Sequence, residues 1–229
     1  TEDPQGLSWD TFRRDPRAVE DPARDFRTRK SIDHTQASLR FEQDFGADRL
    51  TLQGWAGRRA VVQFLSIPVA AQAAEGSAGG VVDFDRDFHG LGARWSRVAD
   101  LAGGTLTVST GLDFERSVDA RRGYENFVGG TTGVRGALRR DERNLVTSAA
   151  PYVQAVWERG DWQWSAGLRH STVKFRVEDD YIVGANGDDS GSVTYRRATP
   201  AAAVLWKAHP ALNLYASLGT GFETPTLGE

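Results

Sequence analysis

The chain has 229 residues and a formal net charge of -3, and acidic and basic residues are mixed along its length, which argues against nucleic acid as its main partner. It contains no cysteine, so a disulfide framework and a thiolate metal site are both excluded. No apolar run reaches the length of a spanning helix, so any contact with a membrane must use strands or surface.

The first stretch, residues 1–34, is predicted to be a loop. It is polar, contains Pro4, Pro16 and Pro22, and shows no sustained period before about residue 30. A short helical turn is expected near 16–20. The start TEDPQG and the absence of methionine indicate an internal piece or a processed form of a longer protein.

Apolar residues at every second position then predict two hairpins. The first joins a strand from residue 35 to one over 50–56 through a turn at 46–48, and a long segment over 61–80 with a small, flexible tail follows. The second joins a strand that ends at 91–96 to one over 105–114. Residues 117–144, which are rich in arginine and glycine, are predicted to form the longest irregular stretch.

The clearest alternation lies in residues 145–175. Ala155 and Trp157 precede a tight turn at 158–161, and Trp162 and Trp164 follow it in the same phase, whereas small or polar residues occupy the opposite phase. Each strand therefore has one apolar and one polar face. The hairpin alone does not decide whether the apolar face contacts lipid or the core of a soluble barrel.

A fourth hairpin follows a polar loop over 178–191, with strands at 198–206 and 212–218, and brings the total to about eight strands. The connections alternate between short and long, which is typical of transmembrane barrels and not of soluble sandwiches. Four tryptophans near the short turns fall in the apolar phase and predict an aromatic girdle at a membrane surface: Trp95, Trp157, Trp162 and Trp206. The pattern favours an all-β, antiparallel transmembrane β-barrel segment.

The final stretch, LYASLGTGFETPTL at 214–227, resembles a segment of the barrel of TonB-dependent outer-membrane receptors, in which a strand with an aromatic residue leads into Gly-x-Gly-Phe, then Pro and a small residue. The matching residues are Tyr215, Ser217, Gly219, Gly221, Phe222, Pro225 and Thr226. The remaining chain is similar to barrel strands of the siderophore-receptor branch. The resemblance implies that residues 1–229 are part of a barrel with short periplasmic turns and long extracellular loops in the bacterial outer membrane. No plug domain, energy-coupling box or aromatic-terminated last strand is visible, so a partial barrel is expected.

The resemblance also implies a function, which is uptake of a ferric siderophore or a similar nutrient. Extracellular loops and the plug capture the chelate, and the periplasmic protein TonB moves the plug. Guanidinium and phenol groups suit a polar or anionic chelate with aromatic groups. The candidate ligand-binding residues lie in the longest predicted loop: Arg121, Arg122, Tyr124, Arg135, Arg139 and Arg140. The alternatives are that these charges are merely solvated or that they bind lipopolysaccharide phosphates.

A second set of polar residues falls in the inward phase and is expected to line a wet lumen: Arg40, Arg94, Asp113 and Arg169. These arginines are expected to pack against a plug or against lumen acids such as Glu42 and Asp113. The segment 83–87, with aspartate at every second position, is also expected on a hydrated lumen face.

No enzyme, cofactor or metal site is expected. The four histidines lack the spacing of metal ligands, and Ser171 and His170, as neighbours on a strand, point to opposite faces. Two alternatives to a receptor fragment stay open. One is a self-contained small outer-membrane barrel with a structural or adhesion role, and the other is a soluble β-barrel that binds a small ligand.

Overall fold

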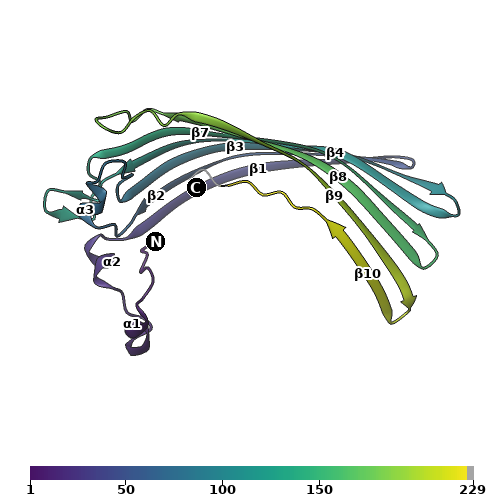
Figure 1. The fold of residues 1–229 in the computed structure, drawn as a ribbon, viewed down its shortest axis with the longest axis horizontal. Coiled ribbons are helices and arrows are strands. Elements are labelled where there is room, and N and C mark those ends of the chain that lie inside the picture. The colour runs from purple at the N-terminus through teal and green to yellow at the C-terminus, as the bar shows by residue number, and fades with distance from the viewer. Residues whose placement is uncertain (226–229) are drawn as a thin grey trace.

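A computed structural model describes residues 1–225, most of which form one antiparallel sheet of eight long strands. The strands lie side by side in chain order, and the sheet is arched (Figure 1). Their bounds are β1 (Arg29–Phe45), β2 (Asp48–Phe64), β3 (Val81–Leu101), β4 (Gly104–Tyr124), β7 (Leu138–Arg159), β8 (Trp162–Asp179), β9 (Gly191–His209) and β10 (Leu212–Gly219). The predicted all-β antiparallel class is confirmed.

The two ends of the sheet differ, as the sequence predicted. At one end tight turns join β1 to β2, β3 to β4, β7 to β8, and β9 to β10. Ala102 and Gly103 both have positive φ (51° and 77°), the backbone that a two-residue hairpin turn with the right twist requires. At the other end lie the connections 65–80, 125–137 and 180–190, together with the segment before β1.

The sheet does not close on itself. β1 and β10 are its two edge strands, and they make no pairing with each other in residues 1–225. The eight strands therefore do not form the self-contained small barrel that the sequence left open. An arched sheet with two open edges is an arc of a wider barrel wall.

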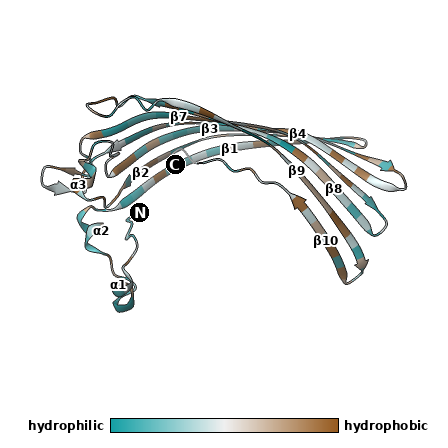
Figure 2. Cartoon of the chain, in the orientation of Figure 1, coloured by the Kyte–Doolittle hydropathy of each residue, from teal (hydrophilic) through white to brown (hydrophobic). Residues whose placement is uncertain are grey.

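The pairing register divides the strand residues between two faces. Arg40 lies opposite Gln53, Gln53 opposite Gly92, and Gly92 opposite Asp113, so these residues share one side, here called the polar face. The other side carries Leu39, Leu91, Trp95, Leu112 and Leu168 and is called the apolar face. Hydrophobic residues recur along β9 and β10, as Figure 2 shows.

Curvature shows which face is the inside of the arch. The large side chains of the apolar face are exposed, for example 48% at Leu91 and 47% at Leu168. Away from the ends of β2 and β3, the buried strand side chains all belong to the polar face: Val61, Ser109, Asp119, Asn144 and Ala150. Side chains crowd together on the concave side of a curved sheet, so the polar face lines the inside.

Three predicted loops are shorter than the sequence suggested. β4 continues to Tyr124 and β7 begins at Leu138, so the expected irregular stretch over 117–144 shrinks to 125–137. The expected loops over 61–80 and 178–191 shrink to 65–80 and 180–190. The ends of β4 and β7 are largely polar on both faces, and the end of β8 places Phe175 and Val177 on the polar face, so the alternation of the apolar band does not continue although the strands do.

The N-terminal segment also differs from expectation. It contains α1 (Trp9–Arg14) and α2 (Asp21–Asp25), with a single turn at Pro16 and Arg17 between them that is closed by a hydrogen bond from the Ala18 N–H to the Asp15 carbonyl (3.1 Å). β1 begins at Arg29 rather than after residue 34. The Ser8 hydroxyl caps α1 by accepting a hydrogen bond from the Thr11 backbone N–H (3.2 Å). No helix in residues 1–225 is long and apolar enough to cross a membrane.

Two buried amides hold the rim of the sheet together at the end with the long connections. Asn126 donates through its side chain to the carbonyl oxygens of Phe26 (3.0 Å) and Leu65 (2.9 Å). Its backbone N–H donates to Gln72 Oε1 (2.7 Å), and Gln72 is the last residue of α3 (Val69–Gln72). Both side chains are fully buried, so the segment before β1 and two connections form one packed rim.

Candidate functional site

The four residues expected to line a lumen all lie on the polar face. Arg40 and Asp113 share one row of the register, and Arg94 and Arg169 are aligned across Gly111 and Tyr152 in the adjacent row on that side. The sequence pattern thus placed them on the same side of the sheet. Their contact with a lumen or a plug remains a prediction.

Each of these arginines has a partner on the wall itself. Arg169 pairs with Asp113 (2.8 Å), and Arg40 pairs with Glu42 (2.7 Å), the two acids that the sequence suggested. Arg94 instead donates to the Ser109 hydroxyl (3.0 Å). Acids on the wall therefore compensate the charges of Arg40 and Arg169, whereas Arg94 has a neutral partner.

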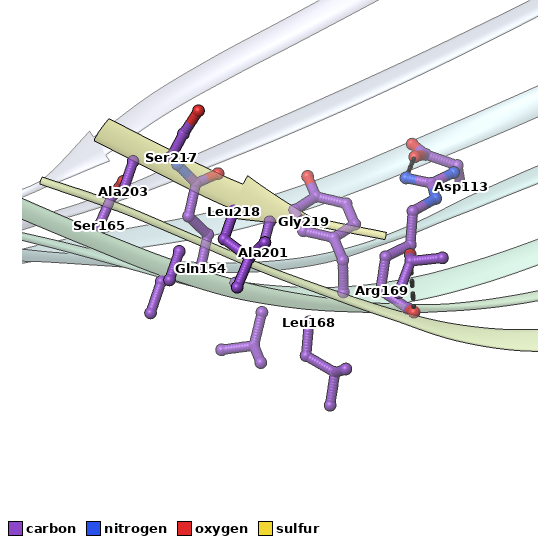
Figure 3. A pocket seen from close by; sticks show the side chains of 16 residues that line it. Asp113, Gln154, Ser165, Leu168, Arg169, Ala201, Ala203, Ser217, Leu218 and Gly219 are labelled. Carbon is purple, nitrogen blue, oxygen red and sulfur yellow. Dashed lines mark hydrogen bonds and ion pairs between the residues drawn. The ribbon is translucent and has the colours of Figure 1, made fainter. Parts of the chain in front are cut away.

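Arg169 forms one end of an open groove of about 670 Å³ on β7 to β10. In Figure 3 the Arg169 side chain extends to Asp113, whereas Leu168 points to the opposite side of the sheet. The guanidinium also lies 5.8 Å from the centre of the Tyr152 ring. The groove therefore offers a phenol, a guanidinium and small side chains to a molecule on the concave side of the sheet.

A second cluster on the polar face was missed by the sequence reasoning. The Trp55 ring packs against Gly90 on the next strand, and Phe88 lies over Gly57, where an added Cβ would stand 2.5 Å from the ring. Phe88 also stacks on His34 (ring centres 5.7 Å apart, planes at 17°). The only sequence feature that could have indicated this cluster is the pairing of aromatic residues with glycines on the neighbouring strand, and this pairing is visible only when the strand register is known.

Three arginines and a glutamate also line the cavity of about 340 Å³ beside these rings: Arg59, Arg86, Arg116 and Glu115. Arg86 makes two parallel hydrogen bonds to Asp119, at 2.7 Å and 2.6 Å, which fix its guanidinium. Arg59 is different, because its Nε is buried and has no hydrogen-bond partner in the described part of the chain. The cavity thus combines aromatic surfaces with an unused guanidinium donor.

The six candidate ligand-binding residues do not form one loop cluster. Arg121, Arg122 and Tyr124 belong to β4 and Arg139 and Arg140 to β7, so only Arg135 lies in a connection. Those five were wrongly placed in a loop, because the strands extend further than the alternation indicates.

Most of these arginines are held in ion pairs at the rim. The distances are 3.2 Å for Arg122–Asp141, 2.9 Å for Arg135–Asp83, 3.8 Å for Arg139–Glu125 and 2.9 Å for Arg140–Glu142. Arg135 also lies over the Tyr124 ring, 4.7 Å from its centre. Within the described residues Arg121 has no ion pair, and it lies on the polar face opposite Phe84.

The aspartates at 83–87 lie on the apolar face, which corrects the expected lumen position. They share the phase of Leu91 and Trp95 but lie nearer the long connections. Asp83 pairs with Arg135, and Asp85 lies 3.6 Å from Arg58. No three histidine, aspartate or glutamate side chains in residues 1–225 are grouped so that they could hold a metal ion.

The four tryptophans of the predicted girdle lie on the apolar face beside the short turns. Trp157 stacks on Trp164 (4.9 Å), Trp164 on Trp162 (5.7 Å), and Trp162 on Trp206 (5.4 Å). Trp95 lies on the same face and is 37% exposed. Trp162, Trp164 and Trp206 are 38–40% exposed, so these rings are not buried in this sheet.

Comparison with known proteins agrees with this architecture. The family described as "TonB dependent receptor-like, beta-barrel" matches residues 1–229. Among solved structures, the unliganded ferric citrate transporter FecA superposes with a TM-score of 0.75 at 19% identity, over 93% of this chain and 30% of FecA. The siderophore receptor PiuA from Acinetobacter baumannii gives 0.66 at 13% identity, over 84% of this chain and 32% of PiuA.

BauA, the ferric preacinetobactin receptor from Acinetobacter baumannii, gives 0.63 at 16% identity, over 82% of this chain and 30% of BauA. At these identities the likeness to solved structures shows the fold alone. The chain spans about a third of the length of these receptors, in agreement with a sheet that is not closed. The chain belongs to the TonB-dependent receptor family, as part of its β-barrel.

Proposed function

We propose that the protein containing this chain imports a ferric siderophore, or a related scarce nutrient, across the bacterial outer membrane. The chain contributes an arc of the barrel wall. Its apolar face contacts outer-membrane lipid, and its polar face lines the lumen through which the ligand passes. The observation that carries the proposal is this division of faces, with exposed tryptophans outside and paired charges and aromatic rings inside.

The family supports a transporter rather than an enzyme, because TonB-dependent receptors are transporters of the bacterial outer membrane. Their partners are siderophore-type ligands and TonB. In this proposal TonB acts through a plug domain inside the barrel. The Asp113–Arg169 groove and the rings beside Arg59 then face the plug or the ligand.

Ligand recognition on this arc is proposed to use guanidinium groups that the wall leaves available. Arg59 offers a buried Nε without a partner, and Arg121 offers a side chain without an ion pair in the described residues. A guanidinium binds carboxylate, catecholate or hydroxamate oxygens through charge-assisted hydrogen bonds. The Trp55 and Phe88 rings add apolar surface beside Arg59.

The test is uptake of radioactive iron by cells that lack their own receptors and express the whole receptor. We expect iron uptake with at least one chelate from a panel of citrate, catecholate and hydroxamate complexes, and we expect it to stop when TonB is deleted. Uptake that is independent of TonB would contradict the proposal, and failure of every ferric chelate would contradict its assignment to ferric siderophores. Arg59→Gln should weaken uptake of an anionic chelate about tenfold, whereas Arg97→Gln, at the tryptophan edge of the apolar face, should leave it unchanged.

A further inference from the structure

Basic residues mark the edge of the apolar face that lies opposite the tryptophan girdle. On β4 the apolar run that includes Leu112 and Phe114 ends at Arg116, and on β9 the run from Trp206 ends at Arg196. On β8 the face changes from Leu168 through polar residues to Lys174. On three strands the apolar side chains of this face are therefore followed by a cation, and the three cations lie at a similar distance from the tryptophans.

The register brings two of these cations into one row with a hydroxyl between them. Arg116 lies opposite Thr147, and Thr147 lies opposite Lys174. Neighbouring strands are about 4.8 Å apart, so the long Arg116 and Lys174 side chains flank a site about 10 Å wide centred on Thr147. Arg196 lies opposite Thr172, which places it beside Lys174 in the adjacent row.

These three cations form no ion pair with other side chains in the described part of the chain. All three are exposed, and no ion pair or side-chain hydrogen bond joins Arg116, Lys174 or Arg196 to another group within residues 1–225. The nearest acid in the register is Asp87, one row further from the apolar band and opposite Val118.

In the rows of this face nearer the rim, several arginines do form ion pairs. There Arg58 lies 3.6 Å from Asp85, and Arg143 and Arg176 both pair with Glu178 (3.3 Å and 2.8 Å). Arg58, Arg143 and Arg176 are thus paired with acids, whereas Arg116, Lys174 and Arg196 at the boundary of the apolar band are not.

The height of this boundary matches a membrane surface. From Trp164 to Lys174 the strand rises about 25 Å along the membrane normal at the usual strand rise and barrel tilt. An apolar band of this height separates the girdle of tryptophans from the row of cations. If the tryptophans lie at one headgroup layer, Arg116, Thr147 and Lys174 lie at the other.

We propose that Arg116, Thr147 and Lys174, with Arg196 beside them, bind a phosphate group of a lipid in the leaflet on the side of the long connections. Two cations and a hydroxyl match the charge and hydrogen-bond acceptors of a lipid phosphate. The inference rests on the proposed contact of the apolar face with membrane lipid, and it is independent of which ligand is imported.

The test uses the whole receptor in detergent, titrated with bisphosphorylated lipid A and followed by native mass spectrometry. Arg116→Gln with Lys174→Gln should weaken lipid A binding by about fivefold for each cation removed, and on the order of 25-fold for the pair. The matched control is Arg97→Gln with Arg159→Gln, which removes the same charge from the same face at the tryptophan edge. The control should bind like the wild type.

Two further arms determine whether the receptor recognises the phosphate group of the lipid. Lipid A without phosphates should bind the wild type about as weakly as bisphosphorylated lipid A binds the double variant, and inorganic phosphate should not compete. The exchange Arg116→Lys with Lys174→Arg keeps both charges and should retain most of the affinity, which also covers the case in which the neutral variant does not fold.

Equal lipid A binding by the wild type and the neutral variant would overturn the proposal. An equal loss in the control pair, or competition by inorganic phosphate, would do so as well. Quenching of the tryptophans by brominated lipid tests membrane contact separately. Quenching without a phosphate effect would therefore refute the site and leave the proposed function intact.

Discussion

The ion pair between Arg86 and Asp119 allows a quantitative test of how the inner wall is stabilised. The Asp119 side chain is 11% exposed and that of Arg86 is 42% exposed, and their two hydrogen bonds are parallel. Asp119→Asn keeps the shape and removes the negative charge. It leaves a half-buried guanidinium without its carboxylate.

The expected cost lies between two limits. Removing one partner of a fully buried ion pair costs about 3–5 kcal/mol, and removing a partner of an exposed pair costs about 0–1 kcal/mol. Because solvent still reaches Arg86, we expect Asp119→Asn to lower the free energy of unfolding by about 2 kcal/mol. Burial of the carboxylate, rather than the number of ion pairs, sets this value.

The same strand offers a matched control. Asp113 also lies on the polar face of β4 and also pairs with an arginine, but its side chain is 37% exposed and that of Arg169 is 43% exposed. Asp113→Asn should therefore cost less than about 1 kcal/mol. Both variants are made in the whole receptor, and unfolding by urea in detergent micelles is followed by tryptophan fluorescence. Equal destabilisation by the two variants would refute the reasoning from burial.

Two further predictions concern the wall and the N-terminal segment. Gly90→Ala should displace the Trp55 ring and destabilise the receptor by about 1–3 kcal/mol in the same urea assay, whereas Gly54→Ala, whose nearest neighbour would be 3.8 Å away, should be tolerated. The backbone hydrogen bond from Ser8 (3.1 Å) is the main cause that lowers the pKa of Glu20 below its ordinary value of 4.5. The carboxylate therefore stabilises the folded segment above pH 4.5, and this contribution is lost as the pH falls through the lower folded-state pKa. Amide exchange in residues 8–14, corrected for its intrinsic pH dependence, should accelerate on acidification, and Glu20→Gln should remove most of the difference.

The strands were most predictable where one face is apolar and the other is polar. In β8, apolar residues alternate with small or polar residues from Trp162 to Leu168, because one face of the strand is apolar and the other is polar. Beyond Lys174 the pattern inverts, because Phe175 and Val177 lie on the polar face and Arg176 and Glu178 on the other, and the strand continues to Asp179. The strand ends that contain Arg121 and Arg139 are rich in polar residues on both faces, and for this reason they were expected in a loop.

Sequence reasoning failed where position, not residue type, decides the environment. The aspartates at 83–87 were expected inside because they are charged, yet the outside of a barrel is also aqueous beyond the apolar band. Trp55 was missed because an aromatic residue in the polar phase becomes meaningful only when the register shows Gly90 opposite it. The rim contacts of Asn126 join segments up to 100 residues apart, and no local pattern indicates them.

The central claim is that the apolar face contacts lipid while the polar face lines an aqueous lumen. The chain has no cysteine, so single cysteines can be introduced at residues 166, 167, 168 and 169 of β8 without background labelling from the chain itself. In the whole receptor in native membranes, a membrane-impermeant maleimide should label positions 167 and 169, and a lipid-soluble maleimide should label 166 and 168. Labelling of all four positions by the impermeant reagent, or the reversed alternation, would contradict the account.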